Sequence, residues 1–140
     1  MLTSDRGSVL MLMPAAVLIV LVLAALTVDL SLVHLGRREV VAATEAAAND
    51  AVTAGLSEAT FRAGGGYKLD PTRVDRAVRA ALDARGLLGR LEDAPHVTIT
   101  GTTVAIRLAL RVDYVFARAL PGFDHSAVVA AQGSATAVTR

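Results

Sequence analysis

The sequence predicts an α+β protein. A single N-terminal transmembrane helix extends into a long stem helix, and a second helix and a three-stranded antiparallel sheet follow it. Three observations predict this fold. Residues 9–28 form an uncharged apolar run, and an alanine-rich stretch without proline comes after it. From His96 onward, apolar and polar residues alternate with the period of two that is typical of strands.

The composition limits the kinds of protein that the chain can be. Its 140 residues suit one compact domain with one accessory element. The net charge of +1 gives no indication of a nucleic-acid binder, which usually has a concentrated basic surface. Because the sequence has no cysteine, disulfides, a thiol nucleophile and a thiolate metal site are excluded.

The apolar run of residues 9–28 is long enough to cross a membrane. Twenty residues of helix span roughly 30 Å, the thickness of the hydrocarbon core of a bilayer. Pro14 lies near the start of the run, where its missing N–H costs little. A cleaved signal peptide is the alternative, but its apolar region is usually only about 7–15 residues long. No clear small-residue cleavage site follows the run, so we expect a retained anchor.

Asp29 is the first charged residue after this run, and two interpretations of it are open. In the first, the span ends at residue 28 and Asp29 is hydrated at the membrane surface. In the second, the span covers residues 15–35 and buries Asp29. A buried carboxylate would then need a partner, such as a charged group or amide of a neighbouring subunit, and would serve in assembly.

The helix is predicted to continue through the alanine-rich stretch to about Arg62, although Gly55 could bend or end it earlier. Small residues recur along this stretch at helical spacing: Gly36, Val40, Ala43, Ala47 and Ala54. Such a stripe lets another backbone approach closely. It could be a packing face against the chain's own C-terminal sheet or a face between subunits.

A second helix follows the glycine-rich break at residues 63–67. Asp70 can cap it, Pro71 suits its first position, and Gly86 suits the position after its end. Its apolar face is predicted to consist of Val74, Ala77, Val78, Ala81 and Leu82. Asp75 precedes Arg79 by four residues, the favourable order for a helical ion pair.

Three strands are predicted after this helix, at residues 96–100, 103–116 and 126–138. In the middle strand every second residue is apolar, so one face of the sheet should be buried and the other mostly wet. The two helices are the available covers for the buried face. A hairpin turn at residues 100–103 and a longer connection at residues 120–125 should join the strands.

The sequence shows no set of catalytic residues. His34, His96 and His125 are widely separated, and the adjacent residues 124–126 (Asp-His-Ser) cannot form a hydrogen-bonded relay by themselves. The three glycines at residues 64–66 lack the preceding strand and the following Lys and Ser of a phosphate-binding loop. We therefore expect a protein that is not an enzyme, with no cofactor, no metal and no small-molecule substrate.

Several motifs in the first 55 residues carry a family resemblance. They are "RGS" at residues 6–8, "VDL" at residues 28–30 and "ATEAAANDAV" at residues 43–52. With the order of apolar segment, helix and alternating strands, they resemble the TadE/TadG-like proteins of tight-adherence (Flp-type) pilus systems, especially the actinobacterial members.

The resemblance implies a pilin-like protein, held in the cell membrane by a single span and acting by subunit association. It implies a short cytoplasmic N-terminus at residues 1–8, a transmembrane helix at 9–35, a stem helix at 36–62 and an extracytoplasmic head at 63–140. The implied partners are the lipid bilayer and other pilus-assembly subunits, either pilin-like or platform proteins, in a pilus or a related secretion apparatus. The candidate assembly contacts are Asp29, Gly36, Val40, Ala43 and Ala47.

Two further expectations accompany the resemblance. Processed pseudopilins usually have a Glu five residues after the peptidase site, whereas cleavage after Gly7 would place Leu12 there. A permanently anchored subunit is therefore expected. The alternative function is a signal-anchored extracytoplasmic module that binds an envelope ligand without joining a pilus.

Overall fold

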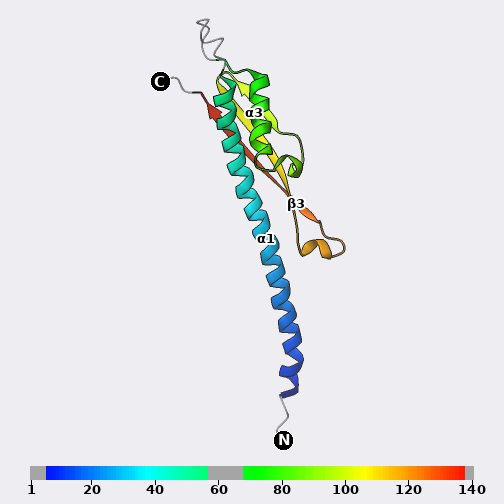
Figure 1. The fold of residues 1–140 in the computed structure, drawn as a ribbon. Coiled ribbons are helices and arrows are strands. Elements are labelled where there is room, and N and C mark those ends of the chain that lie inside the picture. The colour runs from blue at the N-terminus through cyan, green and yellow to red at the C-terminus, as the bar shows by residue number, and fades with distance from the viewer. Residues whose placement is uncertain (1–5, 57–67, 138–140) are drawn as a thin grey trace.

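The computed structural model describes residues 6–56 and 68–137, with side chains of the first helix from Leu12 onward. The long helix α1 (Arg6–Gly55) is followed by α3 (Pro71–Asp83) and the strands β1 (His96–Thr100), β2 (Thr103–Asp113) and β3 (Ser126–Thr136). Two short 3₁₀ helices, η1 (Leu88–Arg90) and η2 (Ala117–Ala119), lie in the connections. We call residues 68–137 the head. Figure 1 shows that the head packs on the C-terminal half of α1, while the N-terminal half projects away from it. The predicted α+β class is confirmed.

Helix α1 is continuous through both predicted segments and ends at Gly55, the earlier of the two ends that the sequence left open. A Cβ at Gly55 would lie 2.6 Å from Cγ2 of Val74, so this residue allows α3 to pack closely. The N–H of Asp70 donates to the Gly55 carbonyl at 2.9 Å and starts α3 beside the end of α1. The rest of the predicted stem, 57–62, and the glycine-rich break at 63–67 lie outside the described residues.

Helix α3 begins and ends as its sequence predicts. The Asp70 carboxylate accepts hydrogen bonds from the N–H groups of Thr72 at 2.9 Å and Arg73 at 3.4 Å. After the helix, Gly86 has a φ of 65°, which glycine adopts without strain. The predicted ion pair between Asp75 and Arg79 is present at 2.9 Å on the exposed face.

The sheet is antiparallel, with β2 in the centre. Gly101, at a φ of 61°, turns the hairpin between β1 and β2. The predicted extension of the middle strand to Phe116 is wrong, because β2 ends at Asp113. There the backbone N–H groups leave the sheet and turn towards α1, as described below. Strand β3 ends at Thr136 within the predicted range, and residue 138 lies outside the described residues.

The core lies between the sheet and the two helices. The predicted alternation of β2 is confirmed. Its inward residues are buried: Val104, Ile106, Leu108, Leu110 and Val112. Each fully buried side chain of this kind contributes roughly 1.5–3 kcal/mol to folding. Strand β3 approaches α1 closely because Gly133 has no side chain, and a Cβ there would lie 3.1 Å from backbone atoms of Thr44 and Glu45.

Candidate functional site at the foot of the head

The exposure of the side chains of α1 changes at Asp29. From Leu12 to Val28 every residue except Ala25 is exposed, and the exposed side chains are almost all apolar. From Asp29 to Gly55 one face is buried at each turn against the head. Within the described part of the chain, α1 is the helix that is long and apolar enough to cross a membrane. The same helix thus supplies both an exposed apolar segment at residues 12–28 and part of the folded core at residues 29–55.

The Asp29 carboxylate lies at this change and is only 4% exposed. Its Oδ1 accepts hydrogen bonds from the N–H of Val115 at 2.8 Å and of Phe116 at 3.1 Å. Its Oδ2 accepts from Phe116 at 3.3 Å and from Ala117 at 2.7 Å. Hydrogen bonds to an ionised carboxylate are roughly twice as strong as neutral ones. Asp29 therefore ties α1 to the connection between β2 and β3.

This geometry contradicts the first interpretation of Asp29 and agrees with the second on burial, while a role of Asp29 in assembly stays a prediction. The carboxylate is buried, so the expectation of a hydrated side chain is wrong. Its partners are backbone amides of the same chain, so burial requires no neighbouring subunit. Phe116, with φ −99° and ψ −42°, has left the extended conformation. Three successive N–H groups therefore face one carboxylate instead of continuing the ladder of β2.

Four of the five small residues of the stripe pack against the chain's own head, the first of the two alternatives given above, whereas Ala54 is exposed and lies off this face. A Cβ at Gly36 would overlap Cγ2 of Val112. Val40, Ala43 and Ala47 are at most 1% exposed within the core. Contact of these residues with another subunit stays a prediction. Within one chain they fix the head on α1.

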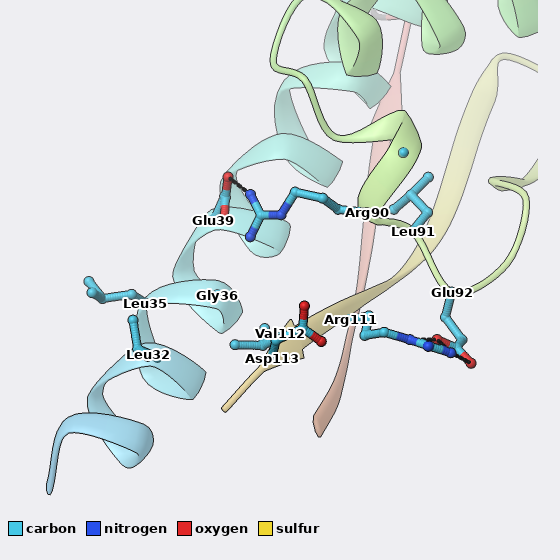
Figure 2. A pocket seen from close by; sticks show the side chains of 11 residues that line it. Leu32, Leu35, Gly36, Glu39, Arg90, Leu91, Glu92, Arg111, Val112 and Asp113 are labelled. Carbon is cyan, nitrogen blue, oxygen red and sulfur yellow. Dashed lines mark hydrogen bonds and ion pairs between the residues drawn. The ribbon is translucent and has the colours of Figure 1, made fainter. Parts of the chain in front are cut away.

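A groove of about 560 Å³ opens between α1 and the C-terminal end of β2. Its apolar part comes from Leu32, Leu35, Gly36, Leu91 and Val112, and its polar part from Glu39, Arg90, Glu92, Arg111 and Asp113. Figure 2 shows Arg90 reaching towards Glu39 on α1, while Arg111 and Glu92 lie together away from the helix. We call this the foot groove, because it lies at the end of the head nearest Asp29.

Two ion pairs border the foot groove. Arg90 and Glu39 approach to 2.9 Å, which joins η1 to α1. The Arg111 guanidinium donates to both carboxylate oxygens of Glu92, at 2.6 and 2.7 Å. This hydrogen bonding holds the pKa of Glu92 below its ordinary value, against a smaller opposing effect of partial burial. Both pairs are partly solvated, so each contributes little to stability by itself.

On the C-terminal side of Asp29, the face of α1 that is not covered by the head forms a second surface. A shallow hollow of about 380 Å³ lies there, lined by His34, Arg37, Arg38, Val41, Ala42 and Glu45. We call these six residues the outward face. Val41 is 39% exposed in spite of its apolar side chain. The head leaves this part of the helix free for other contacts.

The other polar residues considered in the sequence do not gather into a site. His34 lies on α1, His96 begins β1 and His125 precedes β3. Among residues 6–56 and 68–137, no group of three His, Asp or Glu side chains is placed to hold a metal ion. Sequence reasoning missed the amides at residues 115–117, because backbone N–H groups carry no residue-specific signal. The one available sign was the presence of a carboxylate at the end of an apolar run.

Comparison with known proteins gives one match. Residues 7–54 match the family model described as putative Flp pilus-assembly TadE/G-like. This confirms the resemblance drawn from the sequence motifs. The match covers α1 almost completely and does not extend into the head. No curated protein and no solved structure matches the chain.

Proposed function

We propose, starting from the TadE/G-like segment at residues 7–54, that the chain is a membrane-anchored structural subunit of a Tad/Flp-type pilus or a related secretion apparatus. It acts by association with other pilus-assembly subunits and not by catalysis. One observation carries the proposal. The segment that matches a pilus-assembly family is also the helix whose first half is bare and apolar and whose second half builds the core of the head.

The burial pattern supports a membrane boundary at Asp29. Residues 9–28 suffice for a span of about 30 Å. From Asp29 onward α1 packs against the head. The charged side chains of the head must lie outside the hydrocarbon region, so the span has to end before this contact begins. We therefore place the transmembrane segment at residues 9–28, shorter than the 9–35 expected from the sequence. In the proposed orientation, residues 1–8 are cytoplasmic and the head is outside the cytoplasm.

The outward face is the proposed contact with other subunits. The stripe of small residues is occupied by the head, so a neighbouring helix would have to approach α1 from the opposite side. There Val41 and Ala42 offer small apolar surface between Arg38 and Glu45. Opposite charges on one helix face can pair with those of a second helix and set its register.

Photo-crosslinking in membranes tests this proposal. A benzophenone amino acid at Val41 should crosslink to pilus-assembly proteins of the same cell, either pilins or platform proteins. The matched control places the same amino acid at Arg76, which is exposed on α3. Crosslinks to pilus proteins from Val41 and not from Arg76 would support the proposal. If neither position captures a pilus-assembly protein, the assembly role is wrong.

The foot groove is the observation that favours the second candidate, an anchored module that binds an envelope ligand. Its apolar floor and charged border could hold a short peptide or glycan. In that case, charge reversal at Glu39 and Arg90 would abolish ligand binding and leave pilus assembly unchanged. Loss of pilus assembly in an Arg38 and Val41 variant would favour the first candidate instead.

A further inference from the structure

The connection between β2 and β3 carries an unusual amount of exposed apolar surface. We call residues 114–125 the foot loop. Four large apolar side chains in it are substantially exposed: Val115 at 48%, Phe116 at 46%, Leu120 at 51% and Phe123 at 63%. Soluble monomeric proteins rarely expose large apolar patches. Such patches usually mark a contact with another protein or with a membrane.

The position of the foot loop indicates which contact this is. Asp29 holds the backbone of residues 115–117, so the loop lies level with the first residue after the proposed span. Figure 1 shows the loop, with η2, as the part of the head nearest the N-terminal half of α1. A span of residues 9–28 places the bilayer surface at the same height.

Helix α1 also exposes apolar side chains at this level, although they do not all lie on one face of the helix. Leu26, Val28 and Leu30 are 55%, 43% and 61% exposed, and they lie on both sides of Asp29 along the helix. Arg118 in the foot loop is also exposed, and a long basic side chain at this level can reach phosphate headgroups. Asp124 is the acidic residue of the loop and lies at its other end, next to His125.

We propose that the foot loop inserts its apolar side chains into the interface of the bilayer leaflet from which α1 emerges. This inference rests on the proposed membrane span. The loop is then a second membrane contact beside the helix. Two separate membrane contacts on one rigid body fix both the tilt and the rotation of the head relative to the membrane.

Tryptophan fluorescence in vesicles tests the contact, because the chain has no tryptophan of its own. The full chain is reconstituted into phosphatidylcholine and phosphatidylglycerol vesicles, with or without lipids brominated on their acyl chains. Three single variants are compared: Phe123→Trp in the foot loop, Leu21→Trp in the span and Thr100→Trp in the far hairpin. Thr100 is exposed beyond the other end of β2, roughly 35 Å from the loop at the rise of a strand.

The quenching of the three variants distinguishes a membrane contact of the foot loop from its alternatives. We expect brominated lipid to lower the emission of Leu21→Trp strongly and of Phe123→Trp roughly twofold, as suits a ring about 5–10 Å below the headgroups. The emission of Thr100→Trp should not change. Quenching at Leu21→Trp without quenching at Phe123→Trp overturns the loop contact alone. A blue-shifted but unquenched Phe123→Trp assigns the loop to a protein contact and also overturns it. No quenching at Leu21→Trp overturns the span, and the loop contact with it.

Discussion

Asp29 on α1 accepts a 2.7 Å hydrogen bond from the backbone N–H of Ala117, which lies 88 residues later in the chain. The N–H of Val115 donates to the same carboxylate at 2.8 Å. These bonds join the end of the sheet to the point where α1 loses its cover. The bare half of α1 and the head are therefore one mechanical unit. A change in the tilt of residues 12–28 of α1 should therefore change the orientation of the head by the same amount.

Asp29→Asn should loosen this connection without changing the shape of the side chain. One carboxylate oxygen becomes an NH₂ group, which faces N–H donors and cannot accept from them. The hydrogen exchange of the amides at residues 115–117 should become roughly tenfold faster or more. Exchange measured by mass spectrometry in detergent micelles checks this. Asp113→Asn, an exposed change of the same charge, is the control. Equal protection in both variants would contradict the role given to Asp29.

Gly36→Ala should destabilise the head although alanine is the better helix former. The added methyl group would overlap Cγ2 of Val112, at a cost of about 1–3 kcal/mol, which exceeds the gain of up to ~1 kcal/mol in helix propensity. Val112→Ala removes the overlapping methyl groups. In the background of Val112→Ala, Gly36→Ala should therefore cost little or nothing. Thermal unfolding followed by circular dichroism measures the cycle.

Gly89→Ala is the matched control for that cycle, because a Cβ there would meet nothing within 4 Å. It should change the free energy of unfolding by less than about 0.5 kcal/mol. If Gly36→Ala behaves like Gly89→Ala, the close packing of α1 on β2 at this point is not real.

Gly133→Ala should also destabilise, and no single side-chain change should rescue it. Here the Cβ would meet the backbone of α1 at Thr44 and Glu45, 3.1 Å away, so the helix itself must move. We expect a loss of about 1–3 kcal/mol in the free energy of unfolding. Ser134→Ala, at the next and exposed position, is the control and should be close to neutral. An equal effect of the two changes would contradict the tight approach of β3 to α1.

The pair of Glu92 and Arg111 predicts a pH dependence of known sign. The pKa of Glu92 is lowered in the folded chain, mainly by the hydrogen bonds from Arg111. Its contribution to stability is therefore fully present above the ordinary Glu pKa of about 4.3 and is lost as the pH falls through the lower folded value. The melting temperature of Glu92→Gln should lie below that of the unmodified chain at neutral pH. The gap should close in acid. A gap that widens in acid would contradict this sign.

Local signals in the sequence predicted the elements of the head. The Asp70 cap, Pro71 and Gly86 place α3 because each satisfies a requirement of its own backbone. The alternation in β2 identifies its buried face because the period of a strand is two. The turn at Gly101 follows from the same kind of local requirement.

The site could be predicted only in part, because its contacts are not local. The small residues at Gly36, Val40 and Ala43 predict a close approach, but their spacing is the same whether the partner is the chain's own sheet or another subunit. The end of β2 at Asp113 depends on a carboxylate 84 positions earlier, so the alternation alone extended the strand too far. The foot groove likewise joins side chains of α1, η1 and β2.

The central claim is that α1 crosses the membrane before Arg38 and displays the head outside the cytoplasm, and cysteine accessibility tests it most directly. The chain has no cysteine, so single substitutions report without background. Leu21→Cys and Arg38→Cys are expressed in cells and treated with a membrane-impermeant maleimide. We predict that Arg38→Cys is labelled in intact cells and that Leu21→Cys is protected until detergent is added. Labelling of Leu21→Cys in intact cells, or of Arg38→Cys only after lysis, would contradict the account.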